Sequence, residues 1–239
     1  MKKLGLITLM LAQSTAFAVN PAQGWYGGVI LGFSYSPDTS YNYPLSKTVP
    51  SSVPITLPST VPIKIINSEL GLVGIQGGYR CGKLRGEGEF IYNNTPISGL
   101  KIQNTTLKNN KSQYYNFQAG TNTVALMANV FYDFLPSNPE SSIAPYVGFG
   151  AGIADVSTIV KFGFYDTAGV NVKNIRISQS TSSAAGQGII GVSLFADDYT
   201  AFSADFRYFA TATKSKYLDA RTQLYTFNIL FNGMFDAGA

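Results

Sequence analysis

The sequence predicts an all-β fold, an eight-stranded antiparallel up-and-down transmembrane β-barrel. The first observation is residues 122–134, where apolar residues alternate strictly with mixed ones at a period of two. The second is that at least seven other segments can be read with this period, joined by connections that alternate short and long. The third is the composition, with 24 Gly, 13% aromatic and only 13% charged residues. Together they are typical of a barrel with a lipid-facing outer wall, short periplasmic turns and four long extracellular loops.

The first residues have the features of a cleaved secretory signal peptide, predicted to cover residues 1–18. Two lysines precede a short apolar stretch, and Ala16-Phe17-Ala18 forms a small-x-small cleavage site. The apolar stretch is far below the ~20 residues that a spanning helix needs, and no later segment approaches such a run. We therefore expect the barrel domain to occupy residues 19–239 and to cross the membrane with strands.

Each strand is predicted from its alternation and from the turn residues beside it. Trp25 and Tyr26 fit a membrane boundary, where amphipathic rings prefer to lie. Pro136 and Pro139 mark the turn before the fifth strand. An even number of strands brings both ends of the barrel domain to the periplasmic side. The predicted strands are residues 24–36, 68–80, 84–93, 122–134, 144–156, 185–196, 200–210 and 222–235.

The four long connections are all predicted to lie on the outer side. The first contains an imperfect repeat, SSVPITLP followed by STVPIKII, with prolines at positions 50, 54, 58 and 62. Because proline cannot donate a ladder hydrogen bond, we expect an extended protrusion here and not a central strand. Its apolar residues either pack against other loops or form a partner-binding ridge. The predicted loops are residues 37–67, 94–122, 157–184 and 211–221.

Charged residues assign the two faces of the strands. In the third strand, Arg85, Glu87 and Glu89 lie opposite Phe90 and Tyr92. Since a lipid-facing Arg or Lys near the midplane costs ~2–4 kcal/mol, the charged side must face the lumen. An eight-stranded barrel has room only for side chains, so we predict a packed polar network that plugs the barrel, with a gated pore or proton path as the alternative. Its members are Gln76, Arg80, Arg85, Glu87, Glu89, Asn129, Asp133, Asp205 and Arg207.

The residue types argue against catalysis and metal binding. The chain has no His, so the base that outer-membrane barrel enzymes generally place beside Ser or Asp is missing. Without His and with the single Cys81, we expect no zinc or transition-metal site, no cofactor and no intrachain disulfide. We expect Cys81 to be a turn residue. Gly148, Gly150 and Gly152 share the lumen phase of the fifth strand, where small residues relieve crowding.

The outer loops are predicted to be basic. They carry eleven basic and three acidic residues, a net charge of +8, whereas the chain after residue 18 has 15 basic and 13 acidic residues. The loops either neutralise the protein's own lipopolysaccharide or capture acidic host glycans or an anionic receptor. Nucleic acid is not expected, because aromatic residues are concentrated in the strands. The candidate contacts are Lys101, Lys108, Lys111, Lys161, Lys173, Arg176, Lys214 and Lys216.

The last strand carries Tyr225, Phe227, Phe231 and Phe235 in one phase. This strand resembles the assembly signal of bacterial outer-membrane barrels, although the chain continues for four residues after Phe235. The segment APYVGFGAGIADV, residues 144–156, resembles the fifth strand of small barrels of the outer-membrane protein A-like and opacity or surface-antigen type. The resemblance covers the layout of the whole mature chain.

This resemblance implies a monomer in the outer membrane of a Gram-negative bacterium, with its loops at the cell surface. It implies a surface antigen or adhesin-like protein, in which the barrel is a rigid mount and the loops contact the host. The expected partners are outer-membrane lipid and lipopolysaccharide, the barrel assembly machinery, and a host-cell glycan or receptor. The alternatives are a structural envelope barrel whose loops bind lipopolysaccharide, a narrow pore, and a lipocalin-like carrier with Phe202 and Phe206 inside.

Overall fold

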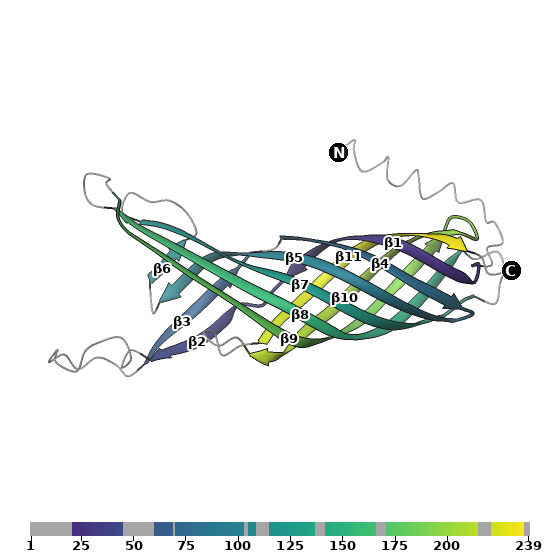
Figure 1. The fold of residues 1–239 in the computed structure, drawn as a ribbon, viewed down its shortest axis with the longest axis horizontal. Coiled ribbons are helices and arrows are strands. Elements are labelled where there is room, and N and C mark those ends of the chain that lie inside the picture. The colour runs from purple at the N-terminus through teal and green to yellow at the C-terminus, as the bar shows by residue number, and fades with distance from the viewer. Residues whose placement is uncertain are drawn as a thin grey trace, which may run out of the picture.

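In the part of the chain that the structure describes, eight long strands close an antiparallel barrel, as predicted (Figure 1). The computed structural model describes residues 21–44, 60–68, 70–102, 105–108, 115–136, 142–165, 171–214 and 221–236. Around the barrel each strand pairs with the next one, and β5 closes the ring by pairing with β7. The barrel strands, in ring order, are β1 (Gly24–Tyr35), β11 (Arg221–Asp236), β10 (Thr200–Lys214), β9 (Asn171–Phe195), β8 (Ile143–Tyr165), β7 (Tyr115–Asp133), β5 (Leu84–Ile102) and β4 (Leu70–Cys81).

The alternation in the sequence becomes two chemically different barrel faces. In β7, Leu126 and Val130 point outward and are 57% and 63% exposed, whereas Met127 and Asn129 between them are both 2% exposed. Successive side chains of a strand point to opposite faces, so this pattern fixes which face meets lipid. Phe202 and Phe206 also point outward, which excludes the lipocalin-like arrangement.

Outward apolar side chains form a belt that faces lipid. Two groups of exposed aromatic residues mark its two edges. One group contains Trp25, Tyr79 and Tyr132, and the other contains Tyr92 and Tyr208. In β8 the belt begins at Ile143 and ends at Ile153, after which the next outward residue is Asp155. This length agrees with the ~9–11 residues of a tilted transmembrane strand. Aromatic girdles of this kind mark the two membrane–water interfaces.

Four strands continue well beyond the lipid belt, contrary to the predicted strand ends. β5, β7, β8 and β9 run on through much of the segments predicted as loops 94–122 and 157–184. The ladder of β8 with β9 extends without a break from Ile143 to Phe164. β1, β4, β10 and β11 end much nearer the belt, so one side of the barrel wall projects far beyond the other (Figure 1). We call the projecting parts of β5, β7, β8 and β9, with the small strands beside them, the extension.

Three short strands complete the extension: β2 (Thr39–Pro44), β3 (Thr60–Asn67) and β6 (Thr105–Lys108). β3 pairs with β2 on one side and with β5 on the other, so the prediction of a protrusion without a central strand was wrong for this part. Pro62 is tolerated because its ladder partner is Asn42 in β2, while pairing with β5 begins only at Ile63. The prolines at positions 50, 54 and 58 lie outside the described residues.

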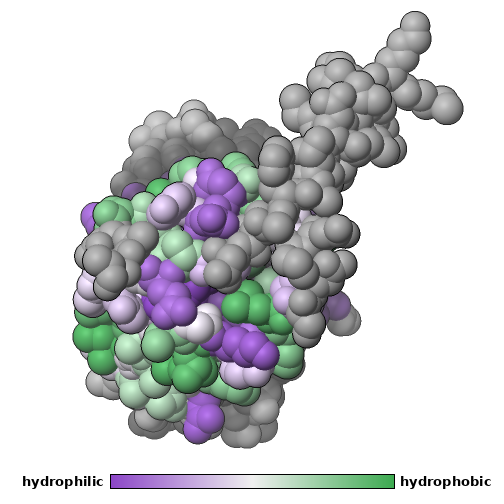
Figure 2. Space-filling model, turned by 90° about the vertical axis from the view of Figure 1, so that its right-hand side faces the viewer, coloured by the Kyte–Doolittle hydropathy of each residue, from purple (hydrophilic) through white to green (hydrophobic). Residues whose placement is uncertain are grey.

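The opposite end of the barrel has short turns. Cys81 and Leu84 are a directly paired position, and Gly82 between them has a φ of +59°, which favours glycine. Cys81 is exposed there as a free thiol. Figure 2 views the molecule from this end, where hydrophilic and hydrophobic residues are mixed. The predicted signal peptide, residues 1–18, lies outside the described residues and stays a prediction.

No helix within the described ranges is long and apolar enough to cross a membrane.

Candidate functional site

The structure places all nine residues of the predicted lumen network inside the barrel. Each is exposed by 7% or less, and they come from four strands, β4, β5, β7 and β10. Eight of the nine side chains form two groups of ion pairs and hydrogen bonds, one near the short turns and one further into the lumen. The ninth, Gln76, donates from Nε2 to Oδ1 of Asn232 at 2.6 Å. Buried charges are costly unless they are paired, and all three arginines and all four carboxylates of the two groups are ion-paired, although Nη2 of Arg85 and Oε2 of Glu87 have no hydrogen-bond partner among the described residues.

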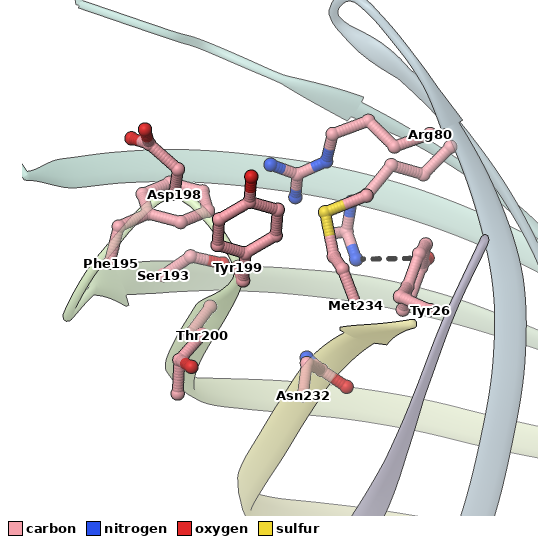
Figure 3. A pocket seen from close by; sticks show the side chains of 11 residues that line it. Tyr26, Arg80, Ser193, Phe195, Asp198, Tyr199, Thr200, Asn232 and Met234 are labelled. Atoms are coloured by element: carbon pink, nitrogen blue, oxygen red, sulfur yellow. Dashed lines mark hydrogen bonds between the residues drawn. The ribbon is translucent and has the colours of Figure 1, made fainter. Parts of the chain in front are cut away.

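The group near the short turns is centred on Arg85. Its Nε lies 2.9 Å from Oδ2 of Asp133, and its Nη1 lies 2.6 Å from Oε1 of Glu87. Arg80 reaches the same Asp133 oxygen with Nη2 at 3.2 Å. Tyr26 donates to Oε1 of Glu87. Figure 3 shows Arg80 and Tyr26 beside a small crevice at this end of the barrel, so the group closes the lumen there.

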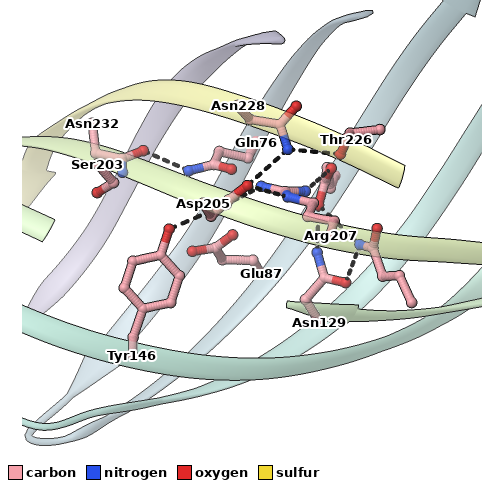
Figure 4. A network of polar contacts seen from close by, with 12 residues as sticks. Gln76, Glu87, Asn129, Tyr146, Ser203, Asp205, Arg207, Thr226, Asn228 and Asn232 are labelled. Carbon is pink, nitrogen blue, oxygen red and sulfur yellow. Dashed lines mark hydrogen bonds and ion pairs between the residues drawn. The ribbon is translucent and has the colours of Figure 1, made fainter. Parts of the chain in front are cut away.

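The second group is centred on Arg207 (Figure 4). Arg207 forms an ion pair with Glu89 and another with Asp205, the latter with 2.9 Å between Nη2 and Oδ2. Asn129 donates from Nδ2 to Oε2 of Glu89 at 2.6 Å. The hydroxyl of Tyr146 donates to Oδ2 of Asp205 at 3.1 Å. Each carboxylate therefore has both an arginine and a neutral donor.

Sequence reasoning missed four members of these groups: Tyr26, Tyr146, Gln187 and Asn228. Gln187 donates to Glu89 and to Asn129, at 3.2 and 2.8 Å. Asn228 donates to Asp205 at 2.7 Å. All four lie in the inward phase of their strands, and that phase could have identified them. Gln187, Asn228 and Tyr146 were missed because the inward phase was followed mainly for charged residues and for Gln76 and Asn129. The expectation that Tyr26 lies at the membrane boundary beside Trp25 was wrong, because its ring is buried in the lumen.

A layer of apolar side chains lies next to the Arg207 group inside the barrel. Leu72, Ile91, Phe209 and Leu224 line one crevice together with Arg207 and are exposed by 6% or less. Phe209 and Ile91 continue the inward phases of Arg207 and Glu89 along the same strands. Apolar constrictions exclude water and ions. The prediction of a polar lumen was therefore incomplete, since the described lumen is filled by a polar and an apolar layer.

The three lumen-phase glycines lie where a side chain has no space. A Cβ at Gly150 would overlap Oδ1 of Asn129, and a Cβ at Gly148 would overlap the ring of Phe131. At Gly152 it would overlap the carbonyl oxygen of Leu126. Gly150 and Gly148 let the side chains of Asn129 and Phe131 on β7 lie over β8, and Gly152 leaves space for the backbone of β7, as the expectation of crowding relief requires.

The candidate basic contacts lie partly on strands of the extension and not on loops. Lys101, Lys108, Lys161 and Arg176 are exposed on β5, β6, β8 and β9. Lys173 and Lys214 belong to β9 and β10, and Lys111 and Lys216 lie outside the described residues.

Pairing of the strands brings four of these bases, Lys101, Lys161, Arg176 and Lys214, directly opposite another base. The opposed positions are Lys64 with Lys101, Lys161 with Arg176, and Lys214 with Arg221. Only long-range strand register creates these pairs, so the sequence pattern could not reveal them. The extension is therefore basic at two cross-strand positions, Lys64 with Lys101 and Lys161 with Arg176, while Lys214 with Arg221 lies outside it, between β10 and β11.

The aromatic residues of β11 face away from the lumen. Phe227, Phe231 and Phe235 are 52%, 46% and 73% exposed, and Tyr225 packs against Tyr35 and Phe206. They contribute to the lipid-facing surface. Their predicted use as an assembly signal stays a prediction.

Comparison with known families and structures agrees with the architecture. The family described as outer membrane protein beta-barrel domain matches residues 4–235. The chain belongs to this family. It is a protein of the Gram-negative outer membrane, and its surroundings are membrane lipid and lipopolysaccharide. No curated protein sequence has a significant match to the chain.

Solved structures are similar to this chain at low sequence identity. OprG from Pseudomonas aeruginosa is 14% identical, with 92% of this chain and 99% of that chain covered and a TM-score of 0.52. Neisserial surface protein A is 13% identical, with 90% and 100% covered and a TM-score of 0.45. Ail of Yersinia pestis, in complex with the heparin analogue sucrose octasulfate, is 11% identical, with 87% and 99% covered and a TM-score of 0.41.

Proposed function

We propose that this outer-membrane barrel is a surface antigen with an adhesin-like role, in which the filled barrel anchors the protein and the extension contacts the host cell. The proposal is carried by the extension itself, because the strands β5, β7, β8 and β9 continue as a paired sheet well beyond the lipid belt. A hydrogen-bonded sheet holds surface residues in fixed positions, which lowers the entropy lost on binding.

The composition of the outward face of the extension supports a binding role in water. Along β8 the outward phase changes from Phe149 and Ile153 to Asp155 and Lys161. On β9 the outward residues above the belt include Arg176, Ser178 and Ser180, all exposed. A face of this composition is suited to contacts in water and not to burial in lipid.

The proposed role is non-catalytic and does not require conduction. In the described lumen, Glu87, Glu89, Asp133 and Asp205 are all ion-paired to arginine, so they are held as a structural network. The apolar layer beside Arg207 adds a barrier to ions. We also propose that residues 1–18 are removed on export, and that the barrel assembly machinery reads the aromatic phase of β11.

The experiment removes the β8–β9 part of the extension while it keeps the barrel. Ser157 and Ser180 are directly opposite, so an Asn-Gly turn can replace residues 158–179 without a change of register in the belt. Beads coated with the refolded wild-type or shortened barrel are counted on host cells, and heat-modifiable gel mobility checks that both barrels are folded.

We expect attachment of wild-type beads and a loss of most attachment with the shortened barrel. Equal attachment of the two would overturn the role of this part of the extension. Wild-type beads that attach no better than bare beads would replace the proposal with a structural envelope barrel whose bases serve the lipopolysaccharide of its own outer leaflet.

A further inference from the structure

Lys161 and Arg176 form a pair of like charges on the outward face of the extension. They occupy directly opposite positions in the β8–β9 ladder, and both side chains are exposed. Directly opposed Cβ atoms are about 4.5–5.5 Å apart, and like charges in such positions destabilise a sheet. The pair is therefore unfavourable for the sheet alone.

Among the described residues, no acidic side chain forms an ion pair with Lys161 or Arg176. Among the described residues, the ion pairs of exposed bases include Lys64 with Asp38, at 3.0 Å, but none involving Lys161 or Arg176. The nearest outward acid along β8 is Asp155, which accepts hydrogen bonds from Ser180 and Ser182. Within the described part of the chain, the charge of Lys161 and Arg176 is thus left for an external anion.

The neighbouring position adds a neutral donor to the pair. Gln118 of β7 lies directly opposite Lys161 on its other side and is exposed. Gln118, Lys161 and Arg176 therefore form a row across three adjacent strands, with neighbouring strands ~4.8 Å apart. An ammonium, a guanidinium and an amide at this spacing can donate together to the oxygens of one or two tetrahedral anionic groups.

The height of the row above the membrane distinguishes two sources of such anionic groups, lipid headgroups and a polymer outside the cell. Lys161 follows Ile153, the last belt residue of β8, by eight residues. At ~3.3 Å per residue and a tilt of ~40°, the row stands about 20 Å above the hydrocarbon boundary. Lipid headgroup phosphates lie close to that boundary, so the row is placed to meet a polymer that approaches from outside.

We propose that Gln118, Lys161 and Arg176 bind a sulfate group of a sulfated polysaccharide. This inference rests on the proposed function and names the ligand class for that surface. Lys64 and Lys101 form a second opposed pair, but Asp38 neutralises one of its charges, so this pair contributes less.

The test is heparin binding to the refolded full-length protein in detergent, measured by calorimetry. The double variant Lys161→Gln with Arg176→Gln is compared with the charge-conserving double variant Lys161→Arg with Arg176→Lys. Lys83→Gln, which removes an exposed base from the short turn at the other end of the barrel, is the matched control. Hyaluronan, which carries carboxylates without sulfates, and lipopolysaccharide vesicles are the two ligand controls.

We expect the neutral double variant to bind heparin at least tenfold more weakly, and the other two variants to bind like the wild type. We expect hyaluronan and lipopolysaccharide vesicles to bind more weakly than heparin to the wild type. Unchanged heparin affinity of the neutral double variant, no heparin binding by the wild type, or equal binding of hyaluronan would each overturn the inference.

Bead attachment separates this inference from the proposed function. Heparin binding that depends on the row, in a protein whose beads do not attach to cells, overturns the proposed function and leaves the site standing. Attachment without heparin binding overturns the site and leaves the attachment role.

Discussion

The lipid belt and the extension are built from the same strands, yet their outward faces are chemically opposite. In β8, Phe149 and Ile153 are 74% and 65% exposed within the belt, whereas Asp155 and Lys161 follow in the same phase beyond it. The backbone ladder with β9 is continuous across the change. The surrounding solvent therefore sets the side-chain pattern, while backbone pairing alone carries the strand across the boundary.

Removal of a buried arginine from the lumen inside the belt is expected to lower the free energy of unfolding most. Arg207→Met leaves Glu89 and Asp205 buried without their cation, which costs about 3–5 kcal/mol of unfolding free energy. Arg176→Met in the extension removes an exposed base and is expected to change stability little. Urea unfolding of the refolded barrels, followed by the fluorescence of the single Trp25, measures both. Equal losses in the two variants would break the comparison.

A charge added to the outward face of the belt is expected to cause the next largest loss of stability. Phe149→Arg places a cation in the belt and is expected to cost about 2–4 kcal/mol, whereas Ser157→Arg, in the same phase of β8 beyond the belt, is expected to cost almost nothing. The same unfolding measurement applies. A large loss from Ser157→Arg would place the membrane boundary further along β8 than the outward residues indicate.

A methyl group added to a glycine distinguishes the packed lumen from the open extension. Gly150→Ala brings a Cβ onto the side chains of Asn129 and Gln187, and overpacking of this kind costs about 1–3 kcal/mol. Gly120→Ala in the extension meets its first neighbour only at 3.7 Å, so a loss well below that of Gly150→Ala is expected. If Gly120→Ala proved the more harmful of the two, the lumen would be less tightly packed than its contacts indicate.

The smallest expected change in stability is that of a variant at Asp197, which lies in the short turn outside the belt. The backbone amides of Tyr199 and Thr200 donate to its carboxylate, and the first of these is the main cause that lowers the pKa of Asp197. Because the folded pKa is below the unfolded one, the stabilisation is complete above the unfolded value of about 3.9 and is lost as pH falls through the folded value. The stability difference between wild type and Asp197→Ala should shrink with acidification, measured by unfolding between pH 7 and pH 3. A difference that does not change with pH would contradict this assignment.

The part of the barrel within the lipid belt could be predicted from the amino-acid pattern alone. Eight alternating segments predicted the strands, and Arg85, Glu87 and Glu89 assigned the lumen phase, which the structure fills with those side chains. This was possible because lipid on one side and a narrow lumen on the other impose opposite requirements on successive residues. Such constraints act within each strand, so the residues of each segment show them without reference to the rest of the chain.

The strand ends and the contacts between residues of different strands could not be predicted from the sequence and became visible in the folded barrel. Residues 94–102 and 157–165 were predicted as loops, because the apolar outward phase that identifies a strand stops where the lipid stops. The apolar layer at Phe209 was also missed, since a residue in the lumen phase can be polar or apolar without changing the alternation. Lys161 and Arg176 are opposed only through the register of β8 with β9, a relation between distant residues that no single segment contains.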